Sequence, residues 1–247
     1  MMSLHEEFEA TGNWLFRRRG YLPLVLFPLL LVAARKSAGL SGDDRLDLAW
    51  EGACLLLALG GLGLRAATVG FVPRDTSGRN TGGQLAGSLN TSGLYSVVRH
   101  PLYLGNYLMW LGVALFSRSW WAPVIVSLVF WLYYERIMFA EEAFLSRRFG
   151  SLYTSWAAIT PAFLPRLTLW RSPQIRFSLL TVLRREHSSL LALMASLTVL
   201  EIVSDHASTG RLVLDPVWGT ALAATLVLCL GVRAIKHRTR LLHVQGR

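Results

Sequence analysis

The sequence has few charged residues and almost no cysteine for its length. Charged residues make up 16% of its 247 residues, whereas 53% are hydrophobic and the mean hydropathy is +0.41. This balance excludes an ordinary soluble domain. The two cysteines, Cys54 and Cys229, each lie inside an apolar stretch, so the sequence indicates neither a disulfide framework nor a metal site.

Two common sequence signals are also missing. The first twenty residues are polar, and no small-residue cleavage site follows the first apolar run, so no cleavable secretory signal is predicted. Gly61 and Gly63 lie inside an apolar stretch, with no strand before them and no third glycine after them. The pattern therefore lacks the dinucleotide-binding fingerprint of soluble enzymes.

The apolar residues are concentrated in blocks that approach or reach the length of a bilayer crossing. About 20 helical residues span roughly 30 Å of hydrocarbon. Six blocks are predicted to be membrane segments: Tyr21–Ala34, Leu48–Phe71, Leu102–Phe116, Trp120–Phe139, Leu190–Val203 and Pro216–Ile235. The first and fifth are short, and Pro23 and Pro28 predict a kink or tilt in the first. Gly60, Gly61 and Gly63 in the second suit close helix packing.

The fold class that follows is all-α, a polytopic membrane helix bundle of about six transmembrane helices with a cytoplasmic cofactor site. Only three residues separate the third and fourth segments, so we expect these two to form a tight antiparallel hairpin. We divide the chain into residues 1–47 with the first segment, a core over residues 48–170, and residues 171–247 with a basic stretch and the last two segments.

Lysine and arginine are distributed unequally between the two sides of this predicted bundle. Nineteen of the 25 lie in the termini and loops of one side, five lie on the other, and Arg65 lies within the second segment. Basic loops stay in the cytoplasm, so both termini and residues 140–188 are predicted to be cytoplasmic. The net charge of +10 then indicates contact with anionic phospholipids rather than with nucleic acid. The stretch that contains Arg184 and Arg185 is predicted to lie on the membrane surface.

One polar cluster directly precedes the third segment. A proline suits the first turn of that helix, which places Arg99 and His100 at its positive N-terminal end, where an anion can bind. His100, Tyr103 and Tyr107 share a face of the helix, and Gly105 leaves room beside them. A basic and aromatic belt at the membrane interface would show the same pattern.

A second cluster, of three carboxylates, lies where the fourth segment leaves the membrane. Glu135 and Glu142 are seven residues apart and share a helical face, and Glu141 lies about 100° round from Glu142. A solvated pair neutralised by the arginines that follow is the simpler interpretation. The hairpin, however, makes the two clusters neighbours. Cationic and acidic groups should then border one small volume at the membrane surface, which suits a zwitterionic ligand.

The order of these motifs resembles a known family. Arg-His-Pro-x-Tyr-x-Gly, Glu-Glu-x-x-Leu, Phe-Gly, Tyr and Thr-Pro-x-Phe-x-Pro follow one another from Gly93 to Pro165, as in the isoprenylcysteine carboxyl methyltransferase and phospholipid methyltransferase superfamily. Its members are membrane enzymes that use S-adenosyl-L-methionine. The resemblance implies a cofactor site formed by Arg99, His100, Pro101, Tyr103, Gly105, Glu141 and Glu142. It also implies that Tyr153 and the segment Thr160–Pro165 close over this site. Trp156 stands where members often have tyrosine, which departs from the pattern.

The expected function is therefore methyl transfer from S-adenosylmethionine to a membrane lipid, at the cytoplasmic face of a bacterial inner membrane. An ionised carboxylate or phosphate acceptor needs no base, whereas an amine acceptor would need one, for which Glu135 and His100 are candidates. Arg99 would hold the carboxylate of the cofactor. The sequence leaves open which acceptor is used and what the oligomeric state is.

The acceptor headgroup has its own candidate residues. The polar loop that precedes the third segment contains Arg79 and Asn80, which would hold an anionic headgroup together with Arg99, with Tyr107 beside the substrate. A loop without a binding role would have the same composition.

Two other classes of protein fit parts of the pattern. A sterol-reductase-like membrane enzyme would bind NADPH in place of S-adenosylmethionine, so the identity of the cofactor separates these two. A non-enzymatic scaffold or small transporter fits less well, because charged residues are nearly absent from the middle of the segments and the polar clusters lie on one side.

Overall fold

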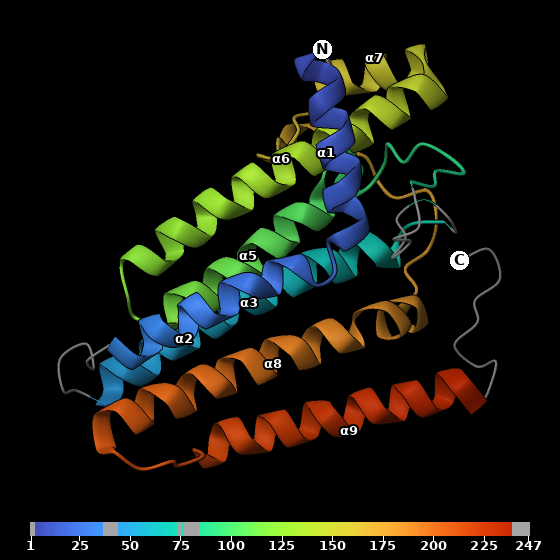
Figure 1. Cartoon of the computed structure of the whole chain (residues 1–247). Helices are drawn as coiled ribbons and strands as arrows, with labels where there is room; N and C mark the ends of the chain where they lie inside the picture. Colours follow the sequence, from blue (N-terminus) through green and yellow to red (C-terminus); the bar gives the residue numbers. More distant parts are fainter. Residues whose placement is uncertain (1–2, 37–43, 74–75, 77–83, 239–247) are drawn as a thin grey trace.

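The computed structural model describes residues 3–36, 44–73, 76 and 84–238, and these form a bundle of helices without a named β-strand (Figure 1). Its elements are α1 Leu4–Arg18, the 3-10 helix η1 Leu22–Leu26, α2 Phe27–Lys36, α3 Asp44–Gly70, α4 Leu94–Val97, α5 Pro101–Phe116, α6 Trp121–Phe149, α7 Ser151–Ile159, the 3-10 helix η2 Leu167–Leu169, α8 Leu179–Thr209 and α9 Pro216–Arg238. The predicted all-α membrane bundle is confirmed.

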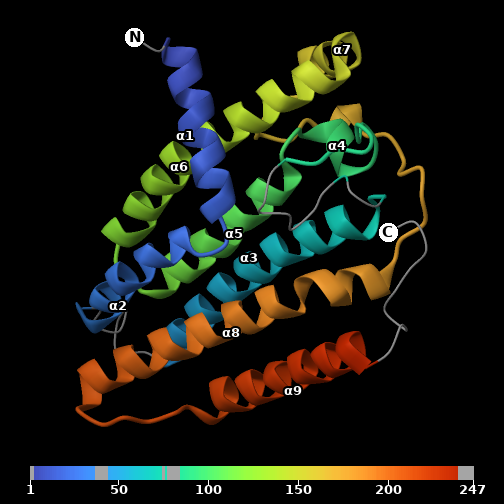
Figure 2. The same ribbon diagram turned by 45° about the vertical axis from the view of Figure 1, so that its right-hand side comes forward.

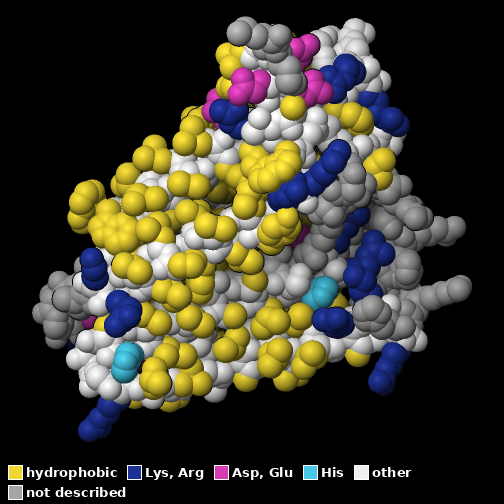
Figure 3. All heavy atoms as spheres, viewed as in Figure 1, with side chains coloured by type: hydrophobic (Ala, Val, Ile, Leu, Met, Phe, Trp, Pro, Cys, Tyr) yellow, Lys and Arg dark blue, Asp and Glu magenta, His cyan; other side chains and the backbone are white. Residues whose placement is uncertain are grey.

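Four helices, α3, α6, α8 and α9, are long and apolar enough to cross a bilayer, and α5 is a shorter apolar helix of 16 residues. Hydrophobic side chains cover much of the bundle surface, whereas charged side chains gather towards its ends (Figure 3). Soluble proteins seldom expose apolar patches of this extent. The chain is an integral membrane protein.

The first predicted segment is not one continuous helix. The chain forms η1 first and then α2, whose 10 residues extend about 15 Å, half the hydrocarbon thickness. Pro23 and Pro28 each lie at the start of one of these elements, where a missing backbone N–H leaves no intrahelical bond unmade. The prolines thus divide the segment rather than kink it.

The fifth predicted segment, Leu190–Val203, is the inner part of a longer helix. α8 begins at Leu179, and the Ser178 side chain accepts a hydrogen bond from the Thr181 N–H at 3.3 Å, which caps the helix start. Arg184 and Arg185, expected on the membrane surface, therefore belong to an early turn of α8. The fifth segment was therefore predicted to begin too late, whereas contact of Arg184 and Arg185 with the membrane surface stays a prediction.

α3 and α5 approach each other at glycines. A Cβ atom on Gly61 would lie 2.5 Å from the Gly105 carbonyl oxygen, closer than any real packing allows, whereas Gly60 and Gly63 face open space. Of the three glycines predicted to support close packing, Gly61 alone meets the neighbouring helix. Gly105 makes the matching approach from α5.

α5 and α6 form the predicted antiparallel hairpin, and α1 lies across α6 in both ribbon views (Figures 1 and 2). α1 begins with a capping box in which Ser3 and Glu6 satisfy each other's backbone N–H. A Cβ on Gly12 would lie 2.1 Å from the Arg136 carbonyl oxygen, so α1 sits tightly against α6. This N-terminal helix was not predicted, although its capping box was readable.

Candidate active site

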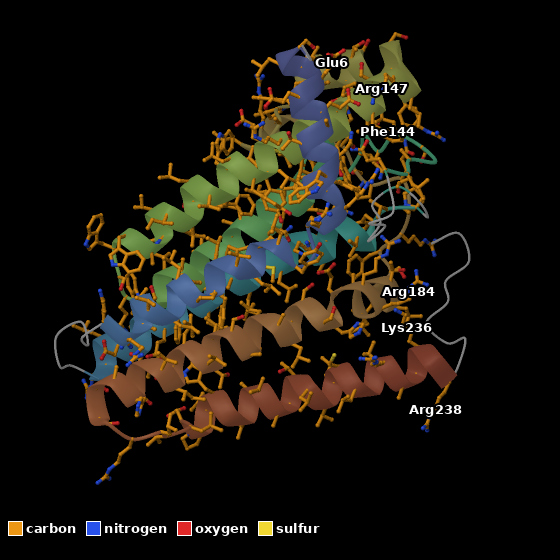
Figure 4. The ribbon with its side chains drawn as sticks, viewed as in Figure 1. Glu6, Phe144, Arg147, Arg184, Lys236 and Arg238 are labelled. Carbon is orange, nitrogen blue, oxygen red and sulfur yellow. The ribbon has the colours of Figure 1, made fainter. Side chains whose placement is uncertain are left out.

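A cavity of about 610 Å³ lies at the end of the bundle where α5 begins and α6 ends. Its walls come from the end of α1, from α3, α5 and α6, from α7, and from the first turns of α8. Phe144 on α6 lines it, and Figure 4 shows this residue close to Arg147, beside α1. The cavity therefore opens among the helix ends that the sequence predicted to meet.

Arg99 and His100 are tied to Glu142 across the hairpin. Arg99 Nη1 donates to Glu142 Oε2 at 2.7 Å, and His100 Nε2 lies 2.9 Å from Glu142 Oε1. The His100 side chain is only 6% exposed. Arg99 and His100 line the cavity, whereas Glu142 contacts both without being part of the lining. Glu142 therefore positions these two side chains.

Glu141 faces the cavity and meets a residue that the sequence did not single out. Its Oε1 lies 3.5 Å from Arg19 Nη1, and its Oε2 lies 3.7 Å from His100 Nδ1. Arg19 also donates to the Tyr103 hydroxyl at 3.2 Å. Arg19 ends a run of three arginines that closes α1, and that helix brings it to the site.

The segment Thr160–Pro165 lies along the start of α5. The backbone N–H of Arg99 donates to the Pro161 carbonyl at 2.8 Å, and that of His100 donates to the Ala162 carbonyl at 3.3 Å. None of these six residues lines the cavity, so closure of this segment over the site stays a prediction. Because both amides are already bonded, an anion at this helix end would be held by the Arg99 side chain rather than by these N–H groups.

α7 contributes two aromatic side chains. The Tyr153 side chain is buried, and its hydroxyl lies near Arg99 and Glu142 without a hydrogen bond of full geometry among the described residues. Burial, together with the nearby Glu142 carboxylate, raises the pKa of Tyr153 well above its ordinary value, so the hydroxyl stays protonated. A buried hydroxyl without a full hydrogen bond at a cavity is a group that a ligand can satisfy. Trp156 Nε1 donates to the Tyr95 carbonyl at 3.2 Å, so the indole supports the wall.

A second ion pair lines the cavity on the side of α3 and α8. Arg65 donates through Nε and Nη2 to the two Glu186 oxygens, each at 2.9 Å. Arg65 Nη1 also contacts Asn106, whose Nδ2 donates to the Tyr134 hydroxyl at 3.1 Å. Arg65, which lies within the second predicted segment, thus meets an acidic group of the site rather than extending to the membrane surface. That group is Glu186, in the stretch expected on the membrane surface.

Glu135 does not belong to this cavity. The inward face of α6 runs from Phe130 through Tyr134 and Ile137 to Glu141, and Glu135 is exposed about 100° round from Tyr134. Glu135 shares a helical face with Glu142, but Glu142 itself lies at the edge of the inward face. Sharing that face therefore does not place Glu135 at the cavity.

The other predicted site residues are placed as follows. The Tyr107 hydroxyl is 3.0 Å from Ser127 Oγ, and its ring packs against Phe130, so this side chain faces α6 rather than the cavity. Gly105 faces α3, whereas Pro101 and Tyr103 do line the cavity. The predicted headgroup residues Arg79 and Asn80 lie outside the described residues.

Comparisons with known proteins support a class for this bundle, a membrane methyltransferase. The phospholipid methyltransferase family model matches residues 53–151. The protein-S-isoprenylcysteine O-methyltransferase of Schizosaccharomyces pombe is 32% identical over 77 residues, which cover 31% of this chain and 33% of that protein. The chain belongs to the isoprenylcysteine carboxyl methyltransferase and phospholipid methyltransferase superfamily.

Two bacterial relatives match over more of the chain. The cobalt-zinc-cadmium resistance protein CzcN of Cupriavidus metallidurans is 37% identical over 164 residues, 66% of this chain and 70% of that protein. The nickel-cobalt-cadmium resistance protein NccN of Alcaligenes xylosoxydans is 34% identical over 160 residues, 65% and 70% of the two chains. Neither name states a reaction. Within the ranges that the structure describes, no group of three or more His, Cys, Asp or Glu could hold a metal ion. No solved structure matches the chain.

Proposed function

We propose that the chain transfers a methyl group from S-adenosylmethionine to a membrane lipid at the cytoplasmic face of a bacterial inner membrane. One observation carries this proposal: Arg99, His100 and Glu141 border a single cavity at the end of a membrane helix hairpin. The family supports a methyltransferase, and the two bacterial relatives support a bacterial setting.

The residues at the cavity fit S-adenosylmethionine, which carries a sulfonium, an ammonium and a carboxylate group and would supply the activated methyl group. Glu141 is an acidic group for the ammonium, and Arg99 is a cationic group for the carboxylate. The Tyr153 hydroxyl is a buried donor without a hydrogen bond of full geometry among the residues described. A volume of about 610 Å³ lies within the usual range for small-molecule pockets.

The contribution of the protein to such a reaction is alignment. Glu142 fixes Arg99 and His100, which in turn would fix the methyl donor. The segment Thr160–Pro165 is bonded to the backbone at the start of α5, and α7 lines the cavity, so in this proposal the two would help to keep water from the reacting groups. Holding donor and acceptor in line removes much of the entropic barrier to the displacement.

The cytoplasmic placement rests on charge. Arg184, Lys236 and Arg238 lie at the same end of the bundle as the cavity (Figure 4). Basic residues at membrane helix ends favour the cytoplasmic side. We therefore orient the cavity toward the cytoplasm.

Cofactor binding tests the reaction class. S-adenosylhomocysteine at about 100 times its Kd should raise the Tm of the detergent-purified protein by about 5 °C or more, whereas NADPH should not. Arg99→Ala should reduce this shift. Arg147→Ala is the control, because Arg147 is exposed and pairs with Glu9 outside the cavity. Stabilisation by NADPH alone would instead support the reductase alternative.

Product analysis tests the acceptor. Membranes that contain the protein are incubated with methyl-labelled S-adenosylmethionine, and the lipids are extracted and analysed by mass. The proposal expects label in a lipid fraction that Arg99→Ala membranes lack. Label confined to protein would contradict a lipid acceptor.

A further inference from the structure

One wall of the cavity comes from outside the region that the family model matches. That match ends at residue 151, whereas α8 begins at Leu179. The first part of α8 nevertheless lines the cavity with Arg185, Glu186, Ser188, Ser189 and Ala192. A helix that lies beyond the family-model match therefore forms part of the cavity wall.

The α8 wall reaches the outer surface of the bundle. Ser188 and Ala192 line the cavity and are also exposed, and they lie one helical turn apart. Ala192 is 13 residues into α8, about 20 Å along its axis, within the apolar span. Met109 of α5 lines the same inner part of the cavity. The cavity thus extends from the polar helix ends to exposed positions on α8 within its apolar span.

The charges beside the cavity favour an acceptor that is already ionised. Glu141 contacts Arg19, Glu142 contacts Arg99, and Glu186 is held by Arg65. Each of these carboxylates is thus engaged by a guanidinium, which disfavours its use as a base for an ammonium group. On the α8 side, the Arg65 guanidinium keeps two of its five N–H groups beyond those that contact Glu186 and Asn106. Arg185 adds a second cation to the cavity wall, so an anion is favoured there.

Building on the proposed function, we propose that α8 forms the acceptor site for an amphiphile with a phosphate or carboxylate headgroup, which enters sideways past Ser188 and Ala192. The acceptor oxygen attacks the methyl carbon, a C–O bond forms as the C–S bond breaks, and the electron pair stays on sulfur. No proton moves in this step. Glu186 is a positioning residue that keeps Arg65 at the headgroup.

Blocking the lateral opening tests the entry route. The probes are oleate, dioleoyl phosphatidic acid and oleylamine, titrated into detergent-purified protein with S-adenosylhomocysteine bound. Ala192→Trp should weaken binding of the preferred anionic probe by roughly tenfold or more, while S-adenosylhomocysteine affinity stays within about twofold. Val199→Trp is the control, because Val199 is 39% exposed on the same helix and does not line the cavity.

The outcomes separate this inference from the proposed function. If wild-type protein does not bind S-adenosylhomocysteine, the proposed function fails. If it does, and Ala192→Trp binds the anionic probe like wild type, or oleylamine binds best, the acceptor site is wrong. Preference for phosphatidic acid or for oleate identifies the headgroup as phosphate or carboxylate.

A double variant tests the positioning pair. Arg65→Met with Glu186→Leu replaces a buried ion pair by apolar side chains, a change that preserves folding in other proteins. We expect retained S-adenosylhomocysteine binding and roughly tenfold weaker binding of the anionic probe. A purely structural defect would weaken binding of both S-adenosylhomocysteine and the anionic probe. Loss of anionic binding alone would therefore show that the pair acts at the acceptor headgroup. Unaltered anionic binding would remove Arg65 from the acceptor site.

Discussion

Each end of the bundle holds an arginine paired with a glutamate, but the two pairs differ in what packs around them. At one end, Arg99 contacts Glu142 at 2.7 Å and lines the cavity. At the other, Arg118 contacts Glu51 at 2.6 Å, and the Trp218 indole donates to the same carboxylate at 3.4 Å. An indole ring thus fills the space beside the second pair.

This difference shows that a buried ion pair does not by itself mark an active site. Removing two charges from water costs much of what their attraction returns, so such pairs are weak evidence for any role. At the cavity end, Arg99 lines the cavity, and the Tyr153 hydroxyl has no hydrogen bond of full geometry among the described residues. The feature that distinguishes the site is therefore the cavity beside Arg99, not the ion pair.

The largest expected effect comes from exchanging one carboxylate at each end. Glu142→Gln should weaken S-adenosylhomocysteine binding by about 10- to 100-fold, because it removes a charged partner from Arg99 and His100. Glu51→Gln should leave this affinity within about twofold while lowering Tm. Isothermal titration of both variants measures the contrast. Equal loss of affinity at both ends would break the comparison.

Adding a methyl group at a helix–helix contact should lower stability to a similar extent at either end of the bundle. A Cβ on Gly61 would meet the Gly105 carbonyl oxygen at 2.5 Å, and one on Gly112 would meet the Cys54 carbonyl oxygen at 2.7 Å. Each Gly→Ala change should reduce the free energy of unfolding by about 1–3 kcal/mol. Gly63→Ala is the matched control, because nothing lies within 4 Å of its new Cβ. Thermal unfolding in detergent that ranks Gly63→Ala with the others would contradict the close approach.

The smallest effect concerns a pair at the cavity end but outside the cavity. The hydrogen bonds from Arg147, at 2.8 and 2.5 Å, hold the pKa of Glu9 below its ordinary value of 4.5. The stabilisation is therefore present above pH 4.5 and is lost as the pH falls through the lowered folded-state pKa. The pair is largely exposed, so it should contribute less than about 1 kcal/mol.

Thermal unfolding of wild type and Glu9→Gln from pH 7 to pH 3 measures this contribution. The two proteins should differ at neutral pH and converge in acid, with equal S-adenosylhomocysteine affinity throughout. A difference that grows toward low pH would show that Glu9 acts in another way.

Much of the site was predictable because its residues lie close in sequence to two helix ends. Arg99 and His100 precede α5, Glu141 and Glu142 lie near the end of α6, and only four residues join the two helices at the far end. A short connection forces such helices to be antiparallel neighbours, so the residues had to meet. The contact between Arg99 and Glu142 confirms that expectation.

Other residues of the site could not be located from local pattern. Arg19 enters because α1 crosses α6, and Glu186 enters because α8 packs against α3. Their partners lie 122 and 121 residues away in the chain. Hydropathy also began the fifth segment too late along the chain, at Leu190 instead of Leu179, because burial of Glu186 depends on Arg65, which no local window contains.

The sequence by itself determined that this is a helical membrane protein, which helix ends meet, and which family it resembles, because these follow from apolar block length, a short connection and local motifs. Only the tertiary structure decided which carboxylate faces the cavity, that Glu135 and Tyr107 lie outside it, and that α8 forms a wall. The physical reason is that side-chain direction and burial depend on long-range packing between helices, which fixes the inward face of each one.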